Sequence, residues 1–524
     1  MRSLKPRCSP RRARTQLRLS IFLALALPAA IALSTFRESV VSPKVRVFFA
    51  SAGETANARL WIFFKDKGPA SAFEKSKALA SARQNLNPRC AWRRGKVRDE
   101  ARLVDEDDLD LFPAYLEKVR GQVTKVRTIS RWLNAVSVEA TGYQLRALER
   151  TLFVSSINLV SSFKRDDPPP SPSATSFPGR ISGRNIRTDY GPSLAQLEQI
   201  GVPELHELGY SGRGVIVCML DTGFRKSHQA FLNARLLAER DFVNGDGDVQ
   251  QDLSDPNDYS DSHGTGTWSV LGGFSPGQLV GPAYGADFLL AKAEIADDER
   301  PIEEDYWVAG IEWAESLGAE VVSSSLGYVD WYTFADMDGR TAVTTRAANR
   351  AVSLGVVVVN AAGNERDDPW GHIIAPADGF GVIAVGAVDA RGHIASFSSP
   401  GPTFDGRTKP EVCALGVDNW MASNRADGSD TFRRGSGTSF ATPLVAGAVA
   451  LILEAHKEWT PRRVRQALLQ TAENSLHPDN NYGWGIIDAA SAAFAARSRN
   501  GDELRSKKRQ GRLRIPSPAG DSRD

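Results

Sequence analysis

Uninterrupted apolar runs mark the second half of the chain. Residues 215–220 and 356–359 are apolar at every position, which is the pattern of parallel strands buried on both faces. The run at 444–453 predicts a buried helix. Pro443 favours a helix start just before this run, because proline is tolerated in a helix's first turn. We therefore expect residues 190–496 to form a three-layer α/β domain around a mainly parallel central sheet.

A smaller α+β unit is predicted for residues 37–163. Its apolar segments are shorter and have the lengths of ordinary strands and helices. Strands are expected at 59–65, 132–138 and 153–160, and helices at 113–123 and 143–152. Residues 164–189, which follow, are rich in Pro, Ser, Gly and Arg. This composition is typical of an exposed, cleavable linker.

The N-terminus carries a targeting pattern. Residues 1–18 contain seven basic and no acidic residues, residues 19–36 are uncharged, and Ala30-Ile31-Ala32 offers a small-residue cleavage site. These features predict a secretory signal peptide over residues 1–36. The alternative is an uncleaved membrane anchor, because 18 uncharged residues are just long enough to span a bilayer. We therefore expect a secreted, periplasmic or extracellular protein, or one anchored in a membrane by its N-terminus.

The near-neutral net charge of +2 hides two regions of opposite sign. Residues 37–189 hold 27 basic and 17 acidic residues, whereas residues 190–496 hold 21 basic and 41 acidic residues. Opposite net charges favour association and speed encounter. The simpler interpretation is that each charge only keeps its own surface soluble. The tail at 497–524 is basic and polar, and we expect it to be disordered.

Ser439 is the first candidate for chemistry. It lies among small residues at the expected start of the apolar helix, where backbone N–H groups favour negative charge. A nucleophile that generates an oxyanion gains from that position. The simpler interpretation is a helix N-cap. A serine nucleophile also needs a base and a group that orients the base.

Three residues could complete such a site. His263 has glycine neighbours and precedes a helical pattern, Asp221 ends the run at 215–220, and Asn364 closely follows the run at 356–359. In open α/β sheets, functional groups gather at the carboxyl ends of strands. Taken singly, each has a simpler interpretation: a polar residue at a helix start, a turn aspartate, or an asparagine in a left-handed turn.

These segments resemble the subtilisin-like serine proteases, the subtilases. The resemblance covers roughly residues 190–490, and rests on VIVCMLDTGF, HGTGTWSV, VVSSSLGY, VVVVNAAGNERDD, FSSPGPTFDGRTKPEV and GTSFATPLVAGAVALI. The order Asp, His, Ser is also that of subtilisin. The resemblance implies that Ser439 is the nucleophile, His263 the general base, Asp221 its orienting acid and Asn364 the oxyanion donor.

The resemblance also implies how substrates and the N-terminal unit bind. Ser325-Leu326-Gly327 and Ala361-Ala362-Gly363 resemble the segments that pair with an extended peptide, a form of β-augmentation. Residues 37–163 resemble the pro-segments of secreted subtilases, which assist folding and then plug the active site. We therefore expect a secreted serine endopeptidase made as an autoinhibited precursor. The alternatives are a membrane-anchored envelope processing protease and a catalytically inactive binding protein with the same fold.

Some positions depart from the family pattern. Ser323 stands where asparagine is usual, and Leu415 stands where the family's Ala-Pro-Gly has proline, so the shape of the pocket stays open. Cys218 and Cys413 lie in apolar strand patterns and are expected to be buried free thiols.

Cofactors and partners follow from the same resemblance. Catalysis is expected to need no cofactor. The spacing of Asn244, Asp246, Asp248, Asp252 and Asp255 resembles a calcium loop, but lacks the glycine and glutamate of an EF-hand, which favours an acidic surface loop. We expect peptide or protein substrates and the protein's own pro-segment as partners, no nucleic acid, and a soluble, monomeric mature domain.

Overall fold

The computed structural model describes residues 39–163, 188–250, 261–294, 302–424 and 430–495. The predicted signal peptide or anchor, most of the predicted linker and the basic tail lie outside these residues. Among the described residues, one helix, Thr438–Ala455, is long and apolar enough to cross a membrane, but 89% of it is buried inside the protein.

A seven-stranded sheet organises the second half of the chain. Its order is β15-β14-β13-β12-β6-β10-β7, and every neighbouring pair is parallel. The two strands predicted from continuous apolar runs, β6 and β13, lie inside this sheet and are buried at every position. The strands are β6 (Ile216–Asp221), β7 (Arg235–Asp241), β10 (Asp287–Lys292), β12 (Val321–Ser324), β13 (Val357–Ala361), β14 (Ile383–Val388) and β15 (Val412–Leu415).

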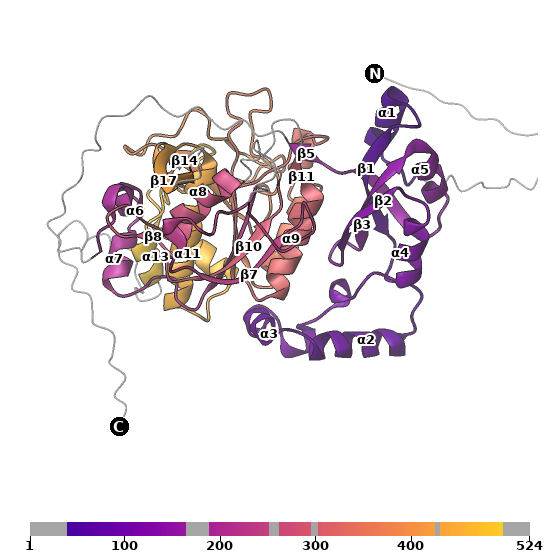
Figure 1. Cartoon of the computed structure of the whole chain (residues 1–524), viewed down its shortest axis with the longest axis horizontal. Helices are drawn as coiled ribbons and strands as arrows, with labels where there is room; N and C mark the ends of the chain where they lie inside the picture. The colour runs from indigo at the N-terminus through magenta and orange to yellow at the C-terminus, as the bar shows by residue number, and fades with distance from the viewer. Residues whose placement is uncertain (1–38, 164–187, 251–260, 295–301, 425–429, 496–524) are drawn as a thin grey trace, which may run out of the picture. The chain divides into compact units, whose positions relative to one another are not determined.

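Helices cover both faces of this sheet, so the predicted three-layer α/β architecture is confirmed (Figure 1). Alternate residues of β6 point to opposite faces. Val217 and Met219 pack in the core with α8 (Asp261–Gly272) and α11 (Thr438–Ala455). Cys218 and Leu220 pack in a second core with α9 (Glu304–Ser316) and α10 (Val343–Ser353). The short helices α6 (Leu194–Glu198) and α7 (Val202–Glu207), with α12 (Pro461–Thr471) and α13 (Ala489–Phe494), complete the first core.

Helix α11 begins at Thr438, so Pro443 lies in its second turn and the expected first-turn position is wrong. Proline has no N–H, so the carbonyl of Ser439 cannot accept the usual helical hydrogen bond. The hydroxyl of Ser325 donates to this carbonyl instead, at 2.8 Å. The missing helical bond thereby becomes a link between α11 and the segment that follows β12.

The predicted α+β unit is also present. Its antiparallel sheet has the order β2-β3-β1-β4 and is packed against helices. The strand expected at 132–138 is β3, which starts three residues later than expected. The delay arises because the chain turns at Asn134, whose φ is 49° and whose N–H bonds the carbonyl of Arg131. The elements are α1 (Pro43–Ala52), β1 (Asn57–Phe64), α4 (Pro113–Arg120), β2 (Lys125–Ser130), β3 (Ala135–Thr141), α5 (Gly142–Glu149) and β4 (Val154–Leu159).

Two helices between β1 and α4 were not predicted. Helix α2 (Ala72–Gln84) has no buried residue, and α3 (Pro88–Gly95) buries Cys90, Arg93 and Arg94 instead of an apolar stripe. Sequence periodicity finds helices through an apolar face, and neither helix has one. Cys90 joins Cys218 and Cys413 as a buried free thiol.

The α+β unit packs directly on the second core of the α/β domain. Trp61, Phe63 and Trp132 belong to the same apolar cluster as Trp307 and Ile311 of α9. The last described strand of the unit, β5 (Ser162–Phe163), pairs antiparallel with β11 (Ile302–Glu303). The two parts of the chain thus share a core and a strand pairing.

A buried ion pair holds β15 to its surroundings, and we expect the substitution Lys409→Met to destabilise the fold. The Lys409 ammonium lies 2.8 Å from Glu411 and donates to the carbonyls of Gly379 and Val382. Methionine would leave the Glu411 carboxylate buried with less compensation. We predict a loss of about 3 kcal/mol in the free energy of unfolding. Urea denaturation of the full chain measures it; Lys457→Met, at an exposed position, is the control.

Candidate active site

Asp221 and His263 are brought together at the carboxyl end of β6. Asp221 is the last residue of that strand, and His263 lies in the first turn of α8. The Nδ1 atom of His263 is 2.6 Å from Oδ1 of Asp221, and both side chains are buried. The helix can approach this closely because residue 264 is glycine. A Cβ there would lie 2.1 Å from the carbonyl oxygen of Gly223.

A third side chain holds the other oxygen of Asp221. Thr267, four residues after His263 on the same face of α8, donates its hydroxyl to Oδ2 at 2.8 Å. The backbone N–H of Thr222 donates to Oδ1, also at 2.8 Å. The carboxylate is therefore fixed on both oxygens. We did not predict Thr267 from the sequence, although its i+4 spacing from His263 carried the signal.

Ser439 lies at the N-terminus of α11. The chain enters the helix through Gly437, whose φ of 147° favours glycine. The Ser439 hydroxyl is 3.4 Å from the carbonyl oxygen of Ser325. The ring of Phe440 lies 5.5 Å from the imidazole of His263. The Nε2 atom of His263 is buried and makes no hydrogen bond to the residues that the structure describes.

The side chain of Asn364, three residues after β13, also reaches the start of α11. Its Oδ1 accepts hydrogen bonds from the backbone N–H and the hydroxyl of Thr438, both at 2.9 Å. Since Oδ1 is engaged beside Ser439, the Nδ2 hydrogens remain as donors on the other side of the amide. The left-handed residue of this turn is Gly363, with a φ of 112°, and not Asn364.

A pocket opens beside Ser439. Both segments expected to bind substrate contribute to it, but Ala362 does not line it. The N–H of Ala362 bonds Val385 and its carbonyl accepts from Ile374, so its backbone is used inside the domain. The pocket is lined by Glu294, Ser325, Leu326, Gly327, Ala361, Gly363, Asn364, Glu365, Ile374, Thr438 and Ser439.

Glu365 gives this pocket an acidic wall. Its side chain is buried and accepts a hydrogen bond from the Ser399 hydroxyl at 2.8 Å. Burial raises the pKa of this carboxyl to about 7, although the Ser399 bond opposes the shift. Sequence reasoning missed Glu365, and only its place next to Asn364 could have indicated it.

The acidic loop that suggested calcium does not form a metal site within the described residues. There, no group of three or more His, Cys, Asp or Glu side chains is placed to hold a metal. The carboxylate of Asp246 accepts from the N–H of Asp248, whose own carboxylate pairs with Lys226 at 3.2 Å. Asp252 and Asp255 lie outside the described residues.

The arrangement as a whole combines a carboxylate–imidazole pair, a hydroxyl at a helix start and an amide donor beside a pocket. This set of groups is suited to acyl transfer through an attacking hydroxyl. The groups come from four separate segments of the chain, which meet at one edge of the sheet.

Comparison with known proteins agrees with this chemistry. The model of the subtilase family (peptidase S8) matches residues 212–485, and that of the peptidase S8 propeptide domain of Bacteroidota matches residues 59–174. Subtilisin E of Bacillus subtilis is 37% identical over 319 residues, which cover 59% of this chain and 74% of that protein. Subtilisin Savinase of Lederbergia lenta is 34% identical over 296 residues, covering 56% and 97%.

A solved structure shows the same fold. Fervidolysin from Fervidobacterium pennivorans, described as a keratinolytic enzyme related to subtilisin, superposes with a TM-score of 0.59 at 22% identity. The match covers 84% of this chain and 61% of fervidolysin. With the family match over more than half of the chain and the similarity to subtilisins, the chain belongs to the subtilase family of serine-type endopeptidases.

Proposed function

We propose that the protein hydrolyses peptide bonds through Asp221, His263 and Ser439, with Asn364 as oxyanion donor. The 2.6 Å contact between Asp221 and His263 carries this proposal. With Nδ1 held by the carboxylate, the Nε2 atom of His263 is left to take the serine proton. Ser439 lies in the first turn of α11 and lines the pocket.

The geometry supports the following sequence of steps. His263 accepts the hydroxyl proton as Ser439 attacks the scissile carbonyl, and Asp221 stabilises the imidazolium that forms. The Nδ2 group of Asn364 and a backbone N–H at the start of α11 stabilise the oxyanion. His263 then protonates the leaving amine, and water hydrolyses the acyl-enzyme with the same base. These steps use only groups of this chain.

We propose that substrates bind as an added strand. Within the chain, the pairing of β5 with β11 is an example of an extended segment that adds to a strand. The side chain that precedes the scissile bond would enter the pocket beside Ser439, where Glu365 favours a cationic group.

We also propose that the precursor is autoinhibited and exported. The pro-segment shares an apolar core with α9, and its last described strand, β5, pairs with β11; both contacts support autoinhibition by a pro-segment held on the catalytic domain. Its positive net charge is complementary to the acidic catalytic region. Export rests on the N-terminal sequence pattern alone, and a membrane-anchored processing protease is its alternative. We also propose a monomeric mature domain and a structural calcium ion. Comparing the melting temperature in the presence of calcium with that in the presence of a chelator tests the calcium proposal.

Labelling with a serine-directed phosphonate tests the catalytic proposal. We expect the processed wild-type protein to be labelled on Ser439 and the Ser439→Ala variant to stay unlabelled. Mass spectrometry of the labelled peptide identifies the site. Absence of label on correctly processed wild-type protein would exclude a serine nucleophile and favour the inactive binding protein.

The substitution Thr267→Val tests whether the second hydrogen bond to Asp221 matters for catalysis. Valine keeps the shape of the side chain but removes the donor to Oδ2. We expect a three- to tenfold lower kcat, roughly the effect of part of one charged hydrogen bond, with KM unchanged. The acid limb of the pH–rate profile should move to higher pH, because the carboxylate keeps more of its negative charge. If Thr267 has only a structural role, Thr267→Val should lower the melting temperature without moving the acid limb. Thr267→Ser, which keeps the hydroxyl, should restore kcat and the position of the acid limb.

The pocket carboxyl predicts a pH-dependent substrate preference. Below pH 7 the Glu365 carboxyl is protonated and neutral, and above it the group is anionic, because burial raises its pKa to about 7. The ratio of kcat/KM for substrates with lysine over methionine before the scissile bond should therefore rise between pH 6 and 8. Taking a ratio cancels the titration of the catalytic histidine. Glu365→Gln should flatten this rise, and a ratio that still climbs in this variant would assign it to another group.

A further inference from the structure

Helix α3 of the pro-segment caps two helices of the catalytic domain. Arg93 donates to the carbonyl of Leu354, which follows α10, at 3.1 Å, and to that of Ala319, just after α9, at 2.7 Å. The thiol of Cys90 lies 3.0 Å from the carbonyl of Glu315 in the last turn of α9. The last carbonyls of a helix lack intrahelical partners and carry partial negative charge. A cationic side chain from α3 thus bonds the carbonyl that follows α10 and a carbonyl in the turn that follows α9.

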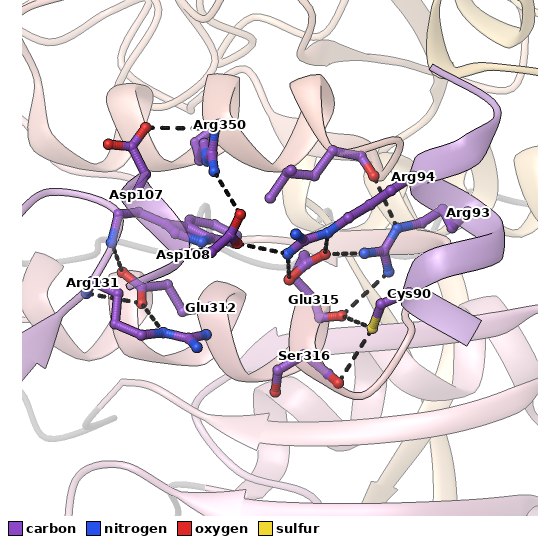
Figure 2. Close-up of polar contacts among 12 residues, drawn as sticks. Cys90, Arg93, Arg94, Asp107, Asp108, Arg131, Glu312, Glu315, Ser316 and Arg350 are labelled. Atoms are coloured by element: carbon purple, nitrogen blue, oxygen red, sulfur yellow. Dashed lines mark hydrogen bonds and ion pairs between the residues drawn. The ribbon is translucent and has the colours of Figure 1, made fainter. Parts of the chain in front are cut away.

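A buried carboxylate locks this contact (Figure 2). Glu315 of α9 faces both arginines of α3. Arg94 places its Nε atom 2.9 Å from Oε1 and its Nη2 atom 2.9 Å from Oε2, a bidentate pair, and Arg93 also bonds Oε1. Arg94 further contacts Asp108 of the pro-segment at 2.9 Å. The side chains of Arg93, Arg94 and Glu315 are at most 2% exposed. Bidentate pairs are geometrically specific, and breaking one member of a buried pair is costly.

Both parts of the chain contribute basic and acidic side chains to the ion pairs around this contact. Arg350 of α10 approaches Asp107 and Asp108 of the pro-segment at 3.5 and 3.3 Å (Figure 2). Arg89 and Lys96 of the pro-segment also pair with Glu320 of the catalytic domain, at 2.8 and 3.3 Å. Each part of the chain therefore supplies both cations and anions, and the contact has a defined register.

The α3 contact lies at the opposite end of the sheet from the active site. The contact surrounds the C-terminus of α9. Glu320, the residue just before β12, donates its backbone N–H to the carbonyl of Ile216 at the start of β6. Asp221 ends β6, so the two places are roughly 15 Å apart along the strand. The pro-segment's other end meets the N-terminus of α9, where the N–H of Ser161 donates to Glu304 at 3.0 Å.

We propose that α3 is an anchor that keeps the pro-segment on the catalytic domain after the chain between them is cut. A contact remote from the substrate edge is not lost when the linker is cleaved. It holds β5 at a high effective concentration next to β11, so that the strand rebinds there faster than it leaves. The consequence for inhibition rests on the proposed function, whereas the anchoring does not.

The test uses the full chain carrying Ser439→Ala and a site for a sequence-specific protease between residues 164 and 187. After cleavage by that protease, gel filtration and a tag on the pro-segment report how fast it dissociates. We expect the chain with an intact anchor to retain its pro-segment through filtration. Glu315→Gln and Arg94→Met should each speed dissociation by at least about 100-fold, the effect of breaking one member of a buried pair. The experiment measures binding of the pro-segment and not catalysis. A negative result would therefore count against the anchor without bearing on the catalytic proposal.

Matched controls change the same residue types at exposed positions. Glu458→Gln in the catalytic domain and Arg83→Met in α2 should leave the dissociation rate unchanged. Arg89→Met changes a partly exposed member of the contact, with a side chain that is 35% exposed, and removes one of the two cations that pair with Glu320. It should speed dissociation by about tenfold and serves if the variants of buried residues do not fold. Immediate loss of the pro-segment from the chain with an intact anchor overturns the proposal. So do equal rates for the folded anchor variants and their controls.

Discussion

The register of three neighbouring parallel strands fixes the active site. Ser324 at the end of β12 lies opposite Leu220 of β6 and Asn360 of β13. Asp221 is the last residue of β6 and Ser325 is the first residue after β12, so both lie at the same end of the sheet. Helices α8 and α11 then bring His263 and Ser439 to that edge. A slip of one residue in any of these strands would turn its last side chain to the other face of the sheet.

Most of the fold and the four proposed catalytic residues could be predicted, because both rest on continuous apolar runs and short motifs. β6 and β13 are buried on both faces, so their sequences are apolar throughout. Thr267 and Glu365 could not be found in this way. Their roles depend on contacts with residues far away in the sequence. A single sequence does not show which of those residues lie close together in space.

The same limit explains why α2 and α3 were missed. Helix α3 is held by charges and by carbonyl groups of another part of the chain, not by an apolar face of its own. Its arginines look like solvent-exposed residues in the sequence, and become buried only because Glu315 and two helix ends face them. Such an interface has a further property. When the parts separate, its charged groups regain water, so this contact surface leaves no large apolar patch exposed.

Pro443 gives Ser439, the proposed nucleophile, a support from outside its own helix. Because this proline cannot bond the carbonyl of Ser439, that carbonyl accepts from the Ser325 hydroxyl, while the Ser439 hydroxyl faces the carbonyl of Ser325. Each of these two bonds joins the hydroxyl of one serine to the backbone carbonyl of the other. Under the proposed function, a peptide strand that adds along residues 325–327 would contact the segment that is bonded to Ser439. The position of a bound peptide and the position of the Ser439 hydroxyl would then be set by the same segment of the chain.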